Sequence, residues 1–320
     1  MKPLTKVAGL VAAVVIVGYF AWGQFGRDTA RPESGNPSSA ATGNGKSTLP
    51  QTSRDGSASE MKPGQVANVQ RLPGSSWANW STRDNLKALY DEKRNTVASD
   101  PEAAFYLHGI LRNCVFLTHD GNAKSRERNL RGKYSPDIEA ARQAMFERLW
   151  SKCAGFEQMA MATVEGELKE FAAIGEKNGN SQFAAREIAR SSRSNDPNFG
   201  AKVISLLETG DATVLWELAP LALNNQVLKK LGGDSLGASQ NALMQAWQMA
   251  ACDAGYDCQN ILVPSFCISA GACTATDYAE GVRMTALSPT EYEIANQLRF
   301  KIGNAIRSKN WSSLGLRPPT

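Results

Sequence analysis

The chain has 320 residues, of which 42% are hydrophobic and 21% charged, and its formal net charge is +4. This composition excludes a chain that is disordered throughout and a membrane protein with many spans, and the length suffices for one or two domains. Residues 1–75 hold eight Lys and Arg against four Asp and Glu, so the rest of the chain is electrically balanced. A balanced domain argues against a nucleic-acid-binding protein, which depends on attraction to phosphates.

The N-terminal segment predicts a membrane anchor. Lys2 and Lys6 precede an uncharged and largely apolar run over residues 7–26. Twenty helical residues rise about 30 Å, which matches the hydrocarbon core of a bilayer. The run lacks a good cleavage site, so residues 1–26 are interpreted as an uncleaved signal anchor; the alternatives are a cleaved signal peptide and a buried core helix. The two lysines place the N-terminus in the cytoplasm and the rest of the chain in the periplasm or outside the cell.

Residues 27–75 predict a flexible linker. They are dominated by Ser, Gly, Pro, Asn, Thr and Ala and contain few large apolar residues. Such a segment cannot bury enough apolar surface to offset its conformational entropy. Residues 40–47 resemble the phosphate-binding pattern GxxxxGK[ST], with Ala40 in place of the first glycine. That pattern needs a strand before it and a helix after it, and the composition predicts neither, so we expect no nucleotide ligand.

Residues 76–320 predict an all-α exported domain. Apolar residues recur at helical spacing, as at Ala295, Leu298 and Ile302. Several helix starts are marked by a capping residue before a proline, as at Ser135 and Ser288. No alternation of polar and apolar residues is long enough to predict a sheet. We therefore expect an irregular stack of helical hairpins held together by disulfides.

Three segments share a turn and a cap followed by an Ala-rich or apolar helix. They cover residues 99–105, 179–185 and 210–216. The first, with Leu107 and Leu111 behind it, resembles the opening of a Sel1-like helical repeat, a relative of the tetratricopeptide class. That resemblance implies a protein-interaction scaffold in a secreted or periplasmic protein cross-linked by cysteines. The copies start 80 and then 31 residues apart, which favours an irregular stack over a regular solenoid.

All cysteines of the chain lie in the predicted exported domain, where an oxidising compartment favours disulfides. They are Cys114, Cys153, Cys252, Cys258, Cys267 and Cys273. The last four permit three pairings, and the sequence does not choose among them. By elimination the remaining two form a pair, which requires the C-terminal ends of two helices to meet and the long loop after residue 119 to cross back.

The C-terminal cysteine segment, residues 252–273, contains Gly255, Pro264 and Gly271 and few helix signals. It is expected to form an irregular, cross-linked loop against a helix over residues 238–251. Zinc is the alternative for its four cysteines, but the close Cys-x2-Cys spacing of structural zinc sites is absent.

A charge run lies in the loop between residues 119 and 135. Its five positive side chains have one negative neighbour, Glu127, and they are Lys124, Arg126, Arg128, Arg131 and Lys133. Such a run favours contact with an acidic partner or with acidic lipid headgroups. The alternative is an ordinary solvated loop.

Candidate catalytic groups are few. Residues 233–237 read Gly-Asp-Ser-Leu-Gly and satisfy the GxSxG pattern of a nucleophilic serine, but both histidines, His108 and His119, precede this serine. The hydrolase families with such patterns have the histidine after the serine. Glu165 and Glu167 face different sides of a predicted helix and are ordinary solvated charges. No residue is therefore assigned to catalysis, to a cofactor or to a metal.

These observations predict a non-catalytic, membrane-anchored envelope protein whose helical domain is a protein-interaction scaffold. Its expected partners are the membrane, through residues 7–26, and another envelope protein, with no nucleic acid and no cofactor. The alternative is a cell-wall hydrolase that cleaves peptidoglycan with carboxylates, which would need an acid of raised pKa in an apolar cleft.

Overall fold

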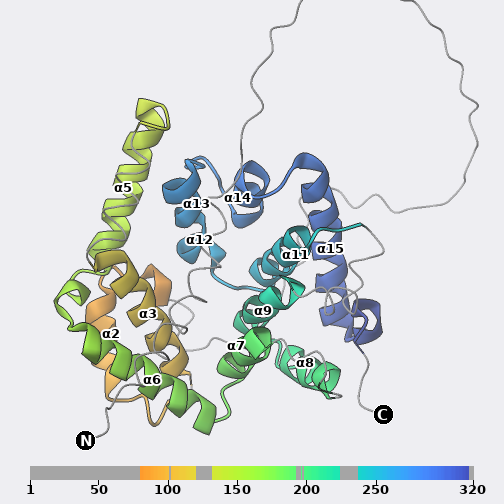
Figure 1. Ribbon diagram of the computed structural model, residues 1–320, viewed down its shortest axis with the longest axis horizontal. Helices are drawn as coiled ribbons and strands as arrows, with labels where there is room; N and C mark the ends of the chain where they lie inside the picture. The colour runs from red at the N-terminus through yellow and green to blue at the C-terminus, as the bar shows by residue number, and fades with distance from the viewer. Residues whose placement is uncertain are drawn as a thin grey trace, which may run out of the picture. The chain divides into compact units, whose positions relative to one another are not determined.

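The computed structural model describes residues 80–100, 102–119, 132–191, 196, 198–223 and 237–316. All regular secondary structure in these residues is helical, which confirms the all-α class (Figure 1). None of the helices in this part of the chain is long and apolar enough to cross a membrane. The predicted anchor, residues 1–26, and the predicted linker, residues 27–75, lie outside the described residues.

The helices before residue 178 surround or border a first hydrophobic core, called here the N-terminal core. They are η2 (Trp80–Thr82), α2 (Leu86–Arg94), α3 (Ala103–Thr118), α5 (Pro136–Lys152), η3 (Phe156–Gln158) and α6 (Met161–Lys177). Its centre is a stripe of α3, where Leu107, Ile110 and Leu111 are fully buried. Phe156 of η3 and Phe171 of α6 are buried against the same core. Burial of side chains of this size contributes about 1.5–3 kcal/mol each.

The later helices surround a second and larger hydrophobic core, the C-terminal core. They are α7 (Ser181–Ser191), α8 (Phe199–Leu207), α9 (Ala212–Leu218), η4 (Ala219–Leu223), α11 (Gln240–Asp253), α12 (Cys258–Ile261), α13 (Val263–Ala270), α14 (Tyr278–Thr285), α15 (Pro289–Ser308) and η6 (Trp311–Leu314). Helix α11 packs along α15, α9 and η4. Ala242, Ala246 and Ala250 form one stripe of α11 at intervals of four residues, and all three are buried. Small side chains at this spacing let neighbouring helices approach closely.

Two of the helix starts expected from the sequence carry the caps that the residue types favour. Asp100 accepts hydrogen bonds from the backbone N–H groups of Glu102 and Ala103 at the start of α3. Ser288 and Glu291 form a complete capping box at the start of α15. Ser135 precedes Pro136 at the start of α5 in the same way, but its side chain makes no capping hydrogen bond.

The structure pairs Cys114 with Cys153, as the sequence predicts, with a Cα–Cα distance of 5.1 Å. Cys114 lies in the last turn and a half of α3, and Cys153 follows the last residue of α5, so the C-terminal ends of the two helices meet. The loop that was expected to cross back includes residues 120–131, which lie outside the described residues.

The four C-terminal cysteines form two local disulfides, Cys252–Cys258 and Cys267–Cys273. The prediction of an irregular loop over this segment is wrong, because α12 and α13 occupy most of it. The sequence predicts a loop that contains Pro264 and Gly271. Instead, Pro264 lies in the first turn of α13, where its missing N–H costs nothing, and Gly271 ends α13 in the left-handed conformation with φ 71°.

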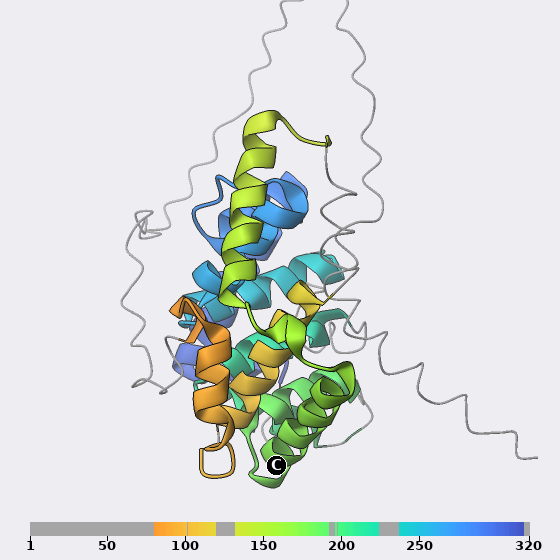
Figure 2. The same ribbon diagram turned by 90° about the vertical axis from the view of Figure 1, so that its left-hand side faces the viewer.

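Helix α5 contributes little to either core, and Arg142 is its one buried residue among those described. Its guanidinium donates hydrogen bonds of 2.9 and 2.8 Å to the carbonyl of Ile268, near the C-terminal end of α13, and pairs with Glu139 at 2.8 Å. It also lies 5.0 Å from the ring centre of Tyr134. Figures 1 and 2 show α5 running beside α13. The helix is thus attached to α3 at one end and to α13 through Arg142.

Candidate functional site

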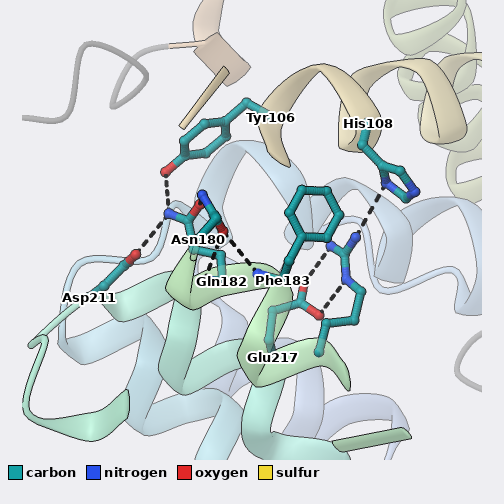
Figure 3. A network of polar contacts seen from close by, with 8 residues as sticks. Tyr106, His108, Asn180, Gln182, Phe183, Asp211 and Glu217 are labelled. Carbon is teal, nitrogen blue, oxygen red and sulfur yellow. Dashed lines mark hydrogen bonds and ion pairs between the residues drawn. The ribbon is translucent and has the colours of Figure 1, made fainter. Parts of the chain in front are cut away.

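Helices α3 and α7 meet through aromatic and charged side chains (Figure 3). The ring of Phe105 on α3 lies edge-on to Phe183 on α7, with 5.3 Å between centroids. The guanidinium of Arg186 lies 4.4 Å from the Phe105 centroid and 5.6 Å from the Phe183 centroid. Cation–π contacts with two rings hold this guanidinium at the junction of the helices.

Arg186 also forms a bidentate ion pair with Glu217 of α9. Its Nε donates to Oε2 at 2.9 Å and its Nη2 to Oε1 at 2.8 Å. The two side chains are only 13% and 17% exposed. Burial acts to lower the pKa of Arg186, but the attraction of Glu217 outweighs it and the net pKa is raised. Arg186 is therefore charged, and Glu217 has both oxygens engaged.

His108 completes this network from α3. Its Nδ1 lies 3.3 Å from Nη1 of Arg186. Burial, and then the positive charges of Arg186, Arg112 and Arg190, lower the pKa of His108 to about 3. The imidazole is neutral at pH 7 and accepts at Nδ1, because a guanidinium can only donate; its proton is therefore on Nε2.

Arg112 and Arg190 extend the site toward solvent. Arg112 lies one helical turn after His108, and Arg190 one turn after Arg186, so each pair shares a helix face. Both arginines are exposed, yet burial, followed by repulsion from Arg186, lowers the pKa of each. Among the residues that the structure describes, neither Arg112 nor Arg190 forms an ion pair or a hydrogen bond, and both remain charged at neutral pH.

A stacked pair of aromatic rings lies close to the arginines. Trp216 of α9 stacks on Tyr256, in the turn before α12, with 4.9 Å between centroids and 5° between ring planes. Burial and the negative charge of Glu217 raise the pKa of Tyr256. Tyr256 also interacts electrostatically with both Arg112 and Arg186, which places it beside the cluster. The stacked pair packs against the C-terminal core next to the guanidinium groups.

A second network fixes the start of α7 relative to α3 and α9. Asn180 accepts a hydrogen bond from the backbone N–H of Gln182, at 3.0 Å. The buried side chain of Gln182 donates to Asp211 before α9 at 2.8 Å and to the hydroxyl of Tyr106 on α3 at 3.4 Å. Figure 3 shows these groups on the side of Phe183 opposite His108. They position the helices that carry the charged cluster.

Phe183 keeps its place because residue 175 of α6 is a glycine. A Cβ atom at Gly175 would collide with the Phe183 ring. That ring contacts both Phe105 and Arg186, so a larger residue at position 175 would disturb these two contacts.

The charge run predicted to contact a partner is only partly described. Lys133 is exposed, whereas Lys124, Arg126, Arg128 and Arg131 lie outside the described residues. The same holds for residues 233–236 of the GxSxG segment.

Of the remaining candidate groups, His119 and Glu167 have structural partners. The Nε2 atom of His119 lies 3.0 Å from the carbonyl of Met159. Glu167 accepts hydrogen bonds from Tyr90 and Arg94, and Glu165 is exposed. Within the described ranges, no three His, Cys, Asp or Glu side chains gather as metal ligands would, and every cysteine is in a disulfide.

Sequence reasoning missed Arg186, Arg190 and Glu217. The available signal is that His108 and Arg112, like Arg186 and Arg190, stand four residues apart on their helices. From one sequence this spacing indicates only that each pair shares a face. That the two faces meet depends on packing between segments about 78 residues apart.

Comparisons with known protein families, curated proteins and solved structures found no match for this chain. The interpretation of the site therefore depends on its own chemistry. It offers the exposed guanidinium groups of Arg112 and Arg190, and among the described residues every cysteine is in a disulfide. Such an arrangement can bind an anionic group, because guanidinium forks match the geometry of oxyanions.

Proposed function

We propose that this chain is a non-catalytic, membrane-anchored envelope protein whose helical domain binds a partner protein. The supporting observation is the junction of α3 and α7, where Arg186 contacts the rings of Phe105 and Phe183. The exposed side chains of Arg112 and Arg190 follow one helical turn further along the two helices. Arginine and aromatic side chains are the types that contribute most to binding at protein interfaces.

The groups of this site are poorly suited to proton transfer. A general acid or base works best with a pKa near the operating pH. His108, with a pKa of about 3, is neutral and weakly basic at pH 7. Glu217 is held by both oxygens in the pair with Arg186. These features favour binding over the alternative of a peptidoglycan hydrolase that uses carboxylates.

The proposal includes the predicted setting of the domain. Residues 1–26 form a single-pass anchor in the inner membrane, and residues 27–75 form a tether that carries the domain into the periplasm. The helical hairpins of the domain, stacked in the manner of a Sel1-like protein, then present the site to another envelope protein. The supporting sequence features are the apolar run over residues 7–26 and the presence of six cysteines.

Site-directed photo-cross-linking in cells expressing the full chain tests this proposal. Gly109 lies between His108 and Arg112 on α3, and an added side chain there meets open space. Gly166 on α6 is a matched control, because it is also a helical glycine with open space around an added side chain. A photoreactive phenylalanine analogue at position 109, and not at position 166, is expected to yield a discrete protein adduct in which mass spectrometry identifies one recurrent partner.

Two results would contradict the proposal. Equal adducts from both positions would indicate nonspecific contact. Glycan chains attached at position 109 without a protein adduct would instead favour an activity on the cell wall.

A further inference from the structure

We propose that an apolar face of α5 is the docking surface for residues 66–77 of this same chain, the segment that leads into η2. The face, called here the α5 apolar face, consists of Met145, Phe146, Leu149 and Trp150. Docking there ends the free part of the predicted linker near residue 65. The inference concerns a different surface from the junction of α3 and α7, so it does not depend on the proposed partner.

The α5 apolar face continues a side of the helix that is already covered at its start. Arg142 donates hydrogen bonds from this side to the carbonyl of Ile268 on α13. Ile138, one turn earlier, lies close to Gly271, where an added Cβ atom would be 3.2 Å from its side chain. The α5 apolar face lies three, four, seven and eight residues after Arg142. This spacing extends the same side toward the C-terminal end of α5.

Neither hydrophobic core covers the α5 apolar face. All four of its side chains are partly exposed. Within the described ranges, none of them belongs to the N-terminal or the C-terminal core. Phe146 and Trp150 contact each other, with 5.8 Å between ring centroids. Because apolar surface of this size is costly to leave in water, a segment that covers it is stabilised there.

The chain enters the domain at the end of this face. Lys152, three residues after Leu149 and on the same side of α5, donates from Nζ to the carbonyl of Ser81 at 2.9 Å. Ser81 is buried, and its hydroxyl donates to Asp257 before α12. These contacts fix η2 beside the C-terminal end of α5. The segment that precedes η2 therefore begins next to the α5 apolar face.

Residues 66–77, which lie outside the described residues, have the composition that such a face requires. They contain the last large apolar side chains before η2, and Arg71 is their one charged residue. The apolar residues are Val66, Val69, Leu72 and Trp77. By contrast, the longer stretch over residues 27–65 holds only Leu49 and Met61 as large apolar residues. Among the residues that precede the domain, this segment gains most from an apolar contact.

The covalent connection favours this segment over a second copy of the chain. Four residues join Trp77 to Ser81 and extend up to about 13 Å, whereas Met145 and Trp150 are separated by a rise of about 7 Å along α5. The segment can therefore reach the whole face. A segment attached by so short a connection has an effective concentration in the millimolar range, which exceeds that of separate protein molecules.

Photo-cross-linking of the purified full chain in detergent micelles tests the inference. An equal mixture of unlabelled and isotopically labelled chains carries a photoreactive phenylalanine analogue in place of Phe146. Irradiation is expected to join position 146 to a peptide within residues 66–77, and both peptides of each product should have the same label. Ala144 is the matched control position, because it is exposed on the opposite side of α5. The analogue there should give no such product.

A pair of variants tests the role of the apolar side chains. Leu72→Ser with Trp77→Ser is expected to lower the yield of the cross-link from position 146 by at least about tenfold, because two large apolar contacts are lost. Leu49→Ser is the matched control: it removes a leucine from the linker outside the segment and should leave the yield unchanged. Circular dichroism checks that the variants retain the helical domain.

Four outcomes would overturn the inference. Products that join a labelled to an unlabelled peptide would assign the face to a second copy of the chain. Equal products from positions 144 and 146 would indicate nonspecific contact. Absence of any link from position 146 to residues 66–77 would refute the docking itself, and a yield that survives the double substitution would refute its apolar basis. The adduct at position 109 in cells reports on the proposed partner alone, so the two proposals can fail separately.

Discussion

The two hydrophobic cores of this domain are held together in different ways. The smaller N-terminal core contains a long-range disulfide, Cys114–Cys153, whose cysteines are 39 residues apart. The larger C-terminal core is formed by the packing of α11 against α15 and α9. Its two disulfides each join cysteines only 6 residues apart. A small core gains most from a cross-link that restricts a long stretch of the unfolded chain, because the entropy removed grows with loop length.

The largest loss of stability is expected when the disulfide of the N-terminal core is removed. Cys114→Ala with Cys153→Ala should lower the free energy of unfolding by about 4 kcal/mol, because the cross-link closes the longest loop. Urea unfolding measures the total loss. Hydrogen exchange should show that backbone amides lose protection in α2, α3 and α6 and keep it in α11 and α15. Equal loss of protection in both cores would contradict the idea that this disulfide serves one core.

The corresponding change in the C-terminal core should cost less. Cys252→Ala with Cys258→Ala opens a short loop, and the same entropy relation gives a loss of about 2 kcal/mol. The comparison uses identical substitutions and the same urea titration. A loss as large as that of the N-terminal variant would show that loop length does not govern the two effects.

The junction between the cores should respond to acid. His108 has a pKa of about 3 in the folded protein against an ordinary value of 6.5. Between these values the unfolded chain binds the proton and the folded protein does not, so stability falls as the pH falls below 6.5, by at most about 1.4 kcal/mol per pH unit. Between pH 6.5 and 5 the loss is therefore up to about 2 kcal/mol. In the His108→Gln variant, urea unfolding at several pH values should show a flatter dependence; an unchanged slope would assign the acid effect to other groups.

The smallest effect concerns two serines that each precede a proline at the start of a helix. Ser288→Ala removes the capping box of α15 and should cost about 1 kcal/mol. Ser135→Ala is the matched control, because its side chain makes no capping hydrogen bond, and should change stability by less than about 0.5 kcal/mol. Thermal unfolding of both variants measures the difference. Equal losses would mean that the hydrogen bond is not what stabilises the start of α15.

The sequence was informative where structure depends on neighbouring residues. The helical spacing of apolar residues and the caps at Asp100 and Ser288 predicted an all-α domain with the observed starts of α3 and α15. The sequence predicts a loop around Pro264 and Gly271, which is wrong. A proline and a glycine can begin and end a short helix as well as interrupt one. Nothing in the sequence could bring Arg186 to His108, since their meeting depends on the packing of distant helices.

The attachment of α5 has a consequence for the arginine site. This helix is covalently joined to α3 of the N-terminal core and is held through Arg142 to α13, whose Phe266 belongs to the C-terminal core. It therefore links the two cores independently of the junction between α3 and α7. Arg112 lies on α3, whereas Arg190 lies on α7, which buries Ala185 and Ala189 in the C-terminal core. A second link of this kind limits how far the two helices can move apart, so a partner that contacts both would spend little binding energy on ordering them.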